Sequence, residues 1–288
     1  MGELRNFSEN RPVASALILV LIAFLVRFLD IFVIRSHEWF GEQVVNKVFG
    51  LLLVFGYVWI VKGNLGAIGL HSRRWLTGFG LGLGFMAVGL FFGYLAEWLF
   101  LRFSGTSPEI VFGLMSHPLF PEESATSGLY LVLILIVGNV VNSFMEEGLF
   151  RGIVITHLGS RMSLLKANLI QATFFGLWHF VLPLLDYLDG NTSFGMMLIT
   201  ALGYVLLSGM IGFVWGTFYQ LTNSLWTSWS AHTLNNTTQN VLQVASTDGG
   251  GMSVAFRNLV IAFIMLVLLP LYKRVCSRLR FQEVETWV

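Results

Sequence analysis

Two adjacent glutamates and an arginine stand at the end of a strongly apolar run, in the segment NSFMEEGLFRG of residues 142–152. On a helix, Glu147 and Arg151 are four residues apart and share a face, so they can form an ion pair, which alone could be structural. Glu146 is rotated by about 100° from Glu147 and lacks that partner. An unpaired carboxylate in an apolar setting suits a general base that both accepts and returns a proton. We therefore expect Glu146 to be such a base.

Two later segments also place polar side chains one helical turn apart. They are TFFGLWHF, with Phe175 and His179, and SAHTLNNT, with His232 and Asn236. Together with Glu146, these groups have the chemistry that peptide hydrolysis needs. The carboxylate activates water and one histidine moves a proton. His232 and Asn236 donate hydrogen bonds to the oxyanion. The alternative for His179 is a hydrogen-bonded residue of the core.

The elements that must position these residues are membrane helices. Hydrophobic residues form 55% of the 288-residue chain and charged residues only 11%, against roughly a quarter in soluble domains. Several apolar stretches approach or exceed the ~20 residues that a helix needs to cross a bilayer. Because lipid leaves backbone groups no other partners, the composition predicts an all-α, polytopic membrane helical bundle. We place about eight transmembrane helices at 13–34, 44–62, 77–102, 128–156, 164–187, 194–221, 224–246 and 254–272.

The chain carries no internal repeat and no linker, so we expect a single membrane domain over residues 1–288. Its net charge of +1 gives no indication of nucleic-acid binding, and the expected partners are the lipid bilayer and membrane-associated molecules. Lysine and arginine gather on the side that holds both termini, which predicts that both termini are cytoplasmic. In a prokaryote the membrane would be the plasma membrane. The connector 104–127 then lies outside, as an interfacial or re-entrant segment.

Other polar residues of the spans have structural explanations. Arg27 and Asp30 are three residues apart in the first span and are expected to form a local ion pair. Glu97, followed by Trp98 and Arg102, fits an interfacial anchor. Glycines four residues apart predict close helix packing, at Gly78 and Gly82, Gly80 and Gly84, Gly89 and Gly93, and Gly212 and Gly216.

A helix rises 1.5 Å per residue, which allows a test of whether the polar groups could meet. On that basis Glu146, His179 and His232 can lie at one level in the inner half of the membrane. We therefore expect a scissile bond to be reached from the cytoplasmic side.

The three motifs together carry a resemblance. EEGLFRG fits E-E-x-x-x-R, FGLWH fits F-x-x-x-H and HTLNN fits H-x-x-x-N, in that order on successive helices. The chain thus resembles the CAAX protease and bacteriocin-processing (CPBP) family of intramembrane endopeptidases, also called the type II CAAX prenyl endopeptidase or Abi family. The resemblance covers residues 125–245, the catalytic core helices of that family. The first three spans match only in being hydrophobic helices.

The resemblance implies a role for each matching residue. Glu146 would activate water, with support from Glu147 and Arg151. His179 would assist that water, and the oxyanion site would be formed by His232 and Asn236. The implied substrates are membrane-associated peptides or proteins, whether prenylated CAAX-like or leader-type.

A metal is the open question in this chemistry. Family members are often labelled metalloproteases, and a glutamate-dependent, metal-free mechanism is also assigned to the family. Glu146, His179 and His232 could bind zinc, but the H-E-x-x-H helix of zinc proteases is absent. We therefore expect no cofactor, with zinc on these three residues as the alternative.

A different class of function could use the same buried polar groups. A non-enzymatic membrane scaffold or a transporter could employ them as a docking site or proton relay. Against a transporter, the chain shows no paired, Gly- or Pro-interrupted spans in two related halves.

The sequence departs from the family pattern at one place. The segment NSLWTSWSAH lacks the proline that many family members carry there. The sequence also leaves the identity of the substrate open.

Overall fold

The computed structural model of the chain describes residues 2–40, 43–71, 74–112, 129–246, 251–282 and 284. These residues are almost all helical. In chain order the helices are α1 (Gly2–Asn10), α2 (Pro12–Leu29), the π-helix η1 (Asp30–Ile34), α3 (Ser36–Phe40), α4 (Val44–Lys62), the 3-10 helix η2 (Leu65–Ile68), α5 (Trp75–Phe103), α6 (Leu129–Glu147), the π-helix η3 (Gly148–Ile155), α7 (Thr156–Gly159), α8 (Leu164–Leu177), α9 (Val181–Leu188), α10 (Phe194–Thr222), α11 (Leu225–Val241), α12 (Gly251–Val267) and α13 (Leu269–Arg278).

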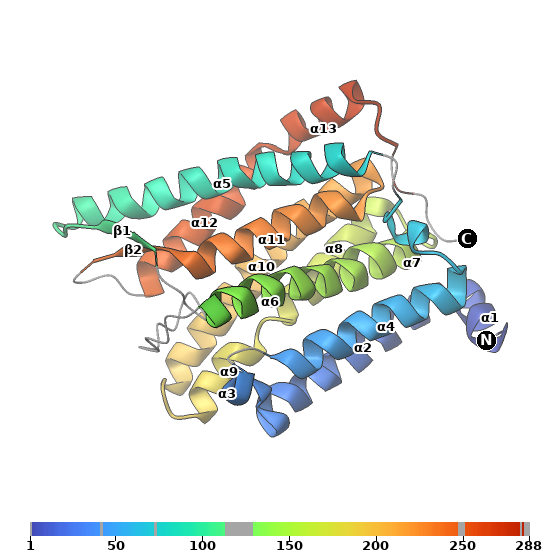
Figure 1. Cartoon of the computed structure of the whole chain (residues 1–288), viewed down its shortest axis with the longest axis horizontal. Helices are drawn as coiled ribbons and strands as arrows, with labels where there is room; N and C mark the ends of the chain where they lie inside the picture. The colour runs from blue at the N-terminus through green and yellow to red at the C-terminus, as the bar shows by residue number, and fades with distance from the viewer. Residues whose placement is uncertain are drawn as a thin grey trace.

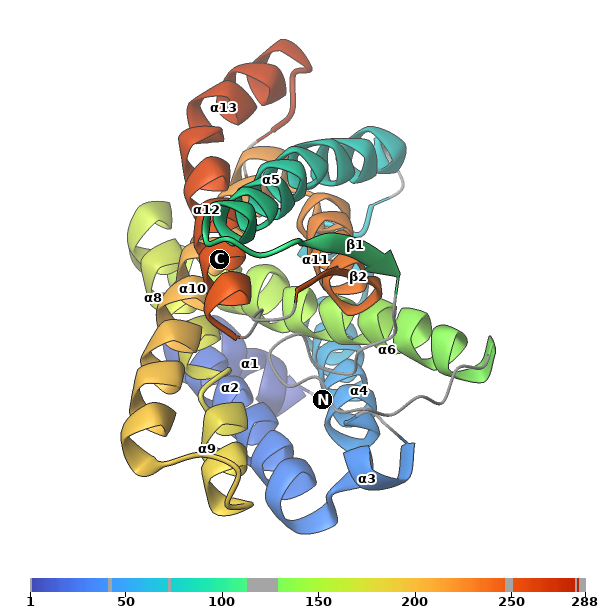
Figure 2. The same ribbon diagram turned by 90° about the vertical axis from the view of Figure 1, so that its left-hand side faces the viewer.

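The long helices lie side by side along the longest axis of the molecule (Figure 1). Helix α6 packs between α4 and α11, and α5 packs against both α11 and α12. Helix α10 contacts α8, α9, α11 and α12, and α2 packs on α4. Viewed from the end, α6 and α11 lie between α4 on one side and α5 on the other (Figure 2). The two helices that carry the E-E-x-x-x-R and H-x-x-x-N motifs are therefore inner helices of the bundle.

The expected membrane spans correspond to helices of the structure. Among the described residues, five helical segments are long and apolar enough to cross a membrane, and a sixth is the pair α12 and α13, bent by 45°. The five are Pro12–Ile34, Val44–Lys62, Trp75–Phe103, Leu164–Leu188 and Phe194–Thr222. The other two expected spans fall on α6 with η3 and on α11, which are the helices that carry the polar motifs. The chain is an all-α polytopic membrane protein, and the expected fold class is confirmed.

Both ends of the described chain lie at the same end of the bundle. In α1, Ser8 Oγ lies 3.2 Å from His157 Nε2 in α7, just before α8. At the start of α8, the Leu164 carbonyl accepts a hydrogen bond from Gln220 Nε2 at 2.7 Å. The carbonyl of Gln220 in turn accepts one from the backbone N–H of Val284 at 2.9 Å. This arrangement fits an even number of crossings. Which side of the membrane holds this end stays a prediction.

One short antiparallel pair of strands lies at the opposite end. Strand β1 (Glu109–Phe112) pairs with β2 (Leu242–Ala245), with Glu109 opposite Ala245. The expected seventh span, 224–246, is therefore helical only to Val241, because the next four residues pair with the connector instead. Of the expected interfacial segment 104–127, residues 113–127 lie outside the described part of the chain.

Two sequence expectations need correction here. Glu97 is not an interfacial anchor beside Arg102: it is fully buried, and Arg257 Nη1 of α12 donates to its Oε2 at 2.9 Å. The partner is 160 residues away along the chain, so sequence spacing could not indicate it. The glycine pair at positions 80 and 84 is also not a packing site, because a Cβ there would meet no atom within 4 Å.

The remaining glycine pairs do mark close helix contacts. A Cβ at Gly82 would overlap Ser230 Oγ and the carbonyl of Thr227, both in α11. A Cβ at Gly93 would overlap the side chain of Ile261 in α12. Small residues at these points let α5 approach both helices closely. This approach fixes α11 against the bundle.

Candidate active site

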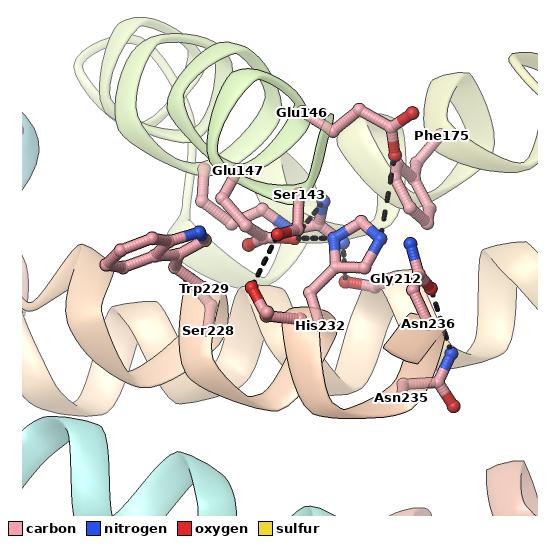
Figure 3. Close-up of polar contacts among 12 residues, drawn as sticks. Ser143, Glu146, Glu147, Phe175, Gly212, Ser228, Trp229, His232, Asn235 and Asn236 are labelled. Carbon is pink, nitrogen blue, oxygen red and sulfur yellow. Dashed lines mark hydrogen bonds and ion pairs between the residues drawn. The ribbon is translucent and has the colours of Figure 1, made fainter. Parts of the chain in front are cut away.

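Hydrogen bonds tie α6 to α11 just before the two glutamates. Ser143 Oγ lies 2.5 Å from Thr233 Oγ1, and Trp229 Nε1 donates to the Val140 carbonyl at 3.1 Å. Thr233 directly follows His232 in the sequence. These bonds therefore hold the last turn of α6 against the middle of α11, and with it Glu146 and Glu147 against His232 (Figure 3).

The helix changes form immediately after Glu147. Residues Gly148–Ile155 form the π-helix η3, and all eight are buried. Gly148 packs against Val54 and Gly152 against Ile68, where no larger residue would fit without movement. π-helical segments are rare in proteins, and those that occur often lie at functional sites. Here the segment carries Arg151, four residues after Glu147.

Glu147 links the arginine to one of the histidines. Its Oε1 lies 3.1 Å from Arg151 Nη1 and 2.8 Å from His232 Nδ1. The other guanidinium nitrogen, Nη2, donates to the carbonyl of Gly212 in α10 at 3.1 Å. Glu147 and Arg151 are fully buried, and His232 is 3% exposed. Since a carboxylate can only accept, Nδ1 of His232 is a donor, and Nε2 also donates only when the ring is the doubly protonated imidazolium.

Glu146 points away from the arginine, as its rotation along the helix predicts. Trp178 Nε1 donates to its Oε1 at 2.9 Å. Its Oε2 lies 3.7 Å from His232 Nε2 and has no hydrogen-bond partner in the described residues. The side chain is 2% exposed. The site therefore holds a buried carboxylate with one oxygen fixed and the other available.

His179 lies in the turn after α8 and directly follows Trp178, which donates to this carboxylate. Its Nδ1 donates to the Phe175 carbonyl at 2.8 Å, which leaves Nε2 as the nitrogen for other contacts. The structure gives no direct hydrogen bond between His179 and Glu146 in the described residues. The Phe175 ring lies between the two histidines, with ring centroids 4.9 Å from His179 and 5.9 Å from His232.

Asn236 lies one turn beyond His232 on α11 and is held by a row of carboxamides. Asn235 Nδ2 donates to Asn236 Oδ1 at 3.2 Å, and Gln239 Nε2 donates to Asn235 Oδ1 at 3.0 Å. Figure 3 shows the Asn236 amide nitrogen turned toward the side of His232 that faces Glu146. This nitrogen is thus a donor directed into the site.

Aromatic rings enclose the charged groups. Trp215 stacks on His232, with centroids 4.2 Å apart and planes inclined by 24°. The Arg151 guanidinium carbon lies 4.3 Å from the Phe175 ring centroid and 5.7 Å from that of Trp215. Such contacts stabilise a buried cation, and the apolar surroundings strengthen every charge interaction within them.

The structure thus brings together Glu146, Glu147, Arg151, His232 and Asn236, with His179 beside them. Sequence reasoning missed four neighbours, which are Trp178, Trp215, Asn235 and Arg27. Trp178 directly precedes His179 within the F-x-x-x-H segment, and this position could have indicated that it lies at the site. Asn235 directly precedes Asn236 and donates to its Oδ1.

The alternative of zinc on Glu146, His179 and His232 can be compared with the geometry of these residues. Within the described residues, no three His, Cys, Asp or Glu side chains are grouped closely enough to hold a metal ion. Of the three alternative ligands, Glu146 keeps Oε2 available, and His179 and His232 each present Nε2. Zinc would need three protein ligands converging on one point.

The fold and site define a polytopic membrane protein whose buried carboxylate, histidines and carboxamide have the chemistry of a hydrolase. Residues 128–238 match the family model described as Rce1-like, type II CAAX prenyl endopeptidase Rce1-like. This segment is a domain of that family, and the family expected from the three motifs is confirmed. The matched residues lie within the expected core 125–245, and a domain of this family indicates an intramembrane CAAX-type endopeptidase in general. Comparison with curated proteins and with solved structures gives no match.

Proposed function

We propose that the chain is an endopeptidase in which Glu146 activates the water that attacks a peptide bond of a membrane-associated substrate. The observation that carries this proposal is the environment of Glu146. Trp178 occupies Oε1, while Oε2 has no partner among the described residues and faces His232 Nε2. A fixed carboxylate with one available oxygen is suited to general base catalysis.

The reaction uses this oxygen twice. Glu146 Oε2 takes a proton from water as the water oxygen attacks the carbonyl carbon, and the carbonyl π electrons move to the oxygen. When the C–N bond breaks, the proton passes to the leaving nitrogen, and Glu146 is again a carboxylate. His179 Nε2 assists in holding the water, because Nδ1 is engaged with the Phe175 carbonyl. Glu147 and Arg151 support the site by holding His232.

The developing oxyanion is stabilised by His232 and Asn236. Asn236 Nδ2 is directed into the site because its Oδ1 accepts from Asn235. His232 Nε2 lies 3.7 Å from Glu146 Oε2 and donates a hydrogen bond when the ring is doubly protonated. Removing one such donor typically costs ~10²- to 10³-fold in kcat.

The proposed step uses no metal, and zinc on Glu146, His179 and His232 is the alternative. The substrate class is a prenylated CAAX-like or leader-type peptide. It reaches the site from the cytoplasmic side, where we place both termini, and in a prokaryote the membrane is the plasma membrane.

The test is cleavage of a panel of prenylated and other membrane-associated peptides by purified protein in liposomes. We expect cleavage by wild type, loss in Glu146→Gln and His179→Ala, and full activity with a zinc chelator. Loss on chelation would make the protein a metalloenzyme. If the folded wild-type protein cleaves nothing, the scaffold and transporter alternatives gain, and cleavage that survives in Glu146→Gln excludes Glu146 as the base.

A further inference from the structure

Arg27 lies outside the segment that matches the family, in helix α2. It is 4% exposed. The predicted ion pair with Asp30 is not formed among the described residues, where Asp30 Oδ2 instead accepts a hydrogen bond from the backbone N–H of Asn46 at 2.7 Å. The guanidinium carbon of Arg27 lies 4.8 Å from the ring centroid of Trp178. The cation therefore stacks on the same indole that donates to Glu146.

The two glutamates of the site differ in their cationic neighbours, and this difference bears on the role of the Arg27–Trp178 contact. Glu147 has Arg151 as its cation, at 3.1 Å, whereas no arginine or lysine of the described residues forms a close ion pair with Glu146. Arg27 is linked to Glu146 through the Trp178 ring, because its guanidinium stacks on the indole whose Nε1 donates to Glu146 Oε1.

We propose that Arg27 is a positioning residue for the Glu146 base, acting through Trp178 and through its charge. This inference rests on the proposed function of Glu146. Trp178 fixes Oε1, and the guanidinium over the indole holds the ring in the orientation that makes this bond. The same cation stabilises Glu146 as a carboxylate before the water attacks. The working site therefore extends to the first membrane helix.

A structural explanation has to be weighed against this role. Buried arginines stacked on aromatic rings also stabilise helix packing, and Arg257 is an example, with its guanidinium carbon 4.5 Å from the Tyr94 ring centroid and Nη1 bonded to Glu97. Arg257 lies among α5 and α12 residues and touches none of the site residues named above. It is the matched control, since it shares the burial and ring contact of Arg27 but not its neighbour Glu146.

The first test compares Arg27→Met, Arg27→Lys and Arg257→Met in peptide cleavage by protein in liposomes, with rates referred to the folded fraction. We expect Arg27→Met to lower kcat by about 10- to 100-fold at unchanged KM, as expected when a reacting group is slightly misplaced. Arg27→Lys should recover part of this loss. Arg257→Met should lower the melting temperature and leave kcat unchanged. Equal kcat values for wild type and folded Arg27→Met would overturn the proposal.

The second test does not depend on activity. The groups that face Glu146 are His179, His232, Arg27 and, at longer range, Arg151. Infrared difference spectroscopy can follow the protonated carboxyl band of Glu146, identified by its loss in Glu146→Gln. Without Arg27, this band should appear at a higher pH than in wild type, because a cation favours the carboxylate. If no peptide is cleaved but the band shifts, the proposed function fails and the charge coupling stands; an unchanged titration overturns the proposal in either case.

Discussion

Glu147 Oε1 accepts a hydrogen bond from His232 Nδ1 at 2.8 Å, between residues that are 85 positions apart. This bond joins the E-E-x-x-x-R motif to the H-x-x-x-N motif. The second glutamate is therefore more than the ion-pair partner of Arg151, since it also fixes the imidazole ring and the proton on Nδ1. The orientation of Nε2, which faces Glu146 at 3.7 Å, depends on it.

The two adjacent glutamates should respond differently to the same substitution. In Glu146→Gln the amide oxygen can still accept from Trp178, so we expect lost cleavage with a melting temperature close to that of wild type. In Glu147→Gln the anion beside Arg151 and His232 is removed, so kcat should fall ~10²- to 10³-fold and the protein should also lose stability. Cleavage assays and thermal unfolding measure the two effects. Equal stability losses in both variants would contradict the assignment.

The ion pair of Glu147 and Arg151 provides a second prediction. Arg151→Met leaves a fully buried carboxylate without its cation, and such a change costs about 3 to 5 kcal/mol. The double variant Glu147→Gln with Arg151→Met removes both charges and should regain much of this stability. It should remain inactive, because His232 has lost its anchor. Unfolding free energies of the four proteins in the double-mutant cycle give the coupling, and additive losses would contradict it.

The sequence predicted what helical spacing can show. The pairing of Glu147 with Arg151 and the divergence of Glu146 follow from four residues or one residue along a helix, and the structure has both. The helical segments followed from apolar length. The spacing could not place His232 beside Glu147 or Arg257 beside Glu97, because these contacts depend on how helices distant in sequence pack together.

Some residues of the site were missed because residues of their type usually serve only in helix packing. Trp178 and Trp215 are aromatic residues in apolar helices, where packing is the ordinary explanation, yet one donates to Glu146 and the other stacks on His232. The π-helix after Glu147 was also beyond sequence reasoning, since its residues fit an α-helix equally well. The catalytic roles of the six motif residues stay predictions until the variants are measured.

Asn235 gives a third prediction, on the orientation of a single amide. Asn235→Leu keeps a similar side-chain size but removes the donor to Asn236 Oδ1, so the Asn236 amide can turn its nitrogen away from the site. We expect kcat to fall about tenfold at unchanged KM, less than the ~10²- to 10³-fold loss in Asn236→Ala. Steady-state kinetics separate the two. A larger loss in Asn235→Leu than in Asn236→Ala would mean that Asn235 itself is the donor.

Two glycines of α5 give a matched pair for a test of helix packing. A Cβ at Gly82 would overlap the Thr227 carbonyl and Ser230 Oγ of α11, whereas a Cβ at Gly84 would meet nothing within 4 Å. Gly82→Ala should push α11 away, cost about 1 to 3 kcal/mol and lower kcat, because α11 carries His232. Gly84→Ala should keep wild-type activity and equal or exceed wild-type stability. Similar behaviour of the two variants would show that the close approach is not required.

The end of the bundle that carries Arg35 and Asp189 should show a pH-dependent stability. Arg35 Nη1 and Nη2 donate to the two Asp189 carboxylate oxygens, each at 3.0 Å, and tie the end of the first span to the end of α9. These hydrogen bonds hold the pKa of Asp189 below its ordinary value of 3.8. A carboxyl whose pKa is lowered by folding contributes stability at neutral pH that is lost as the pH falls through its folded pKa.

Asp189→Asn tests this link. The Arg35 and Asp189 side chains are each 32% exposed. The ion pair should therefore contribute only modestly to the free energy of unfolding, up to about 1 kcal/mol. We expect the variant to melt below wild type at pH 7, and the difference to shrink when the pH falls below 3.8, where the wild-type carboxylate also becomes protonated. Thermal unfolding of both proteins across this range measures it, with cleavage at pH 7 unchanged because the pair lies outside the site. A stability difference that stays constant down to the lowest pH would show that the charge of Asp189 is not what stabilises this end.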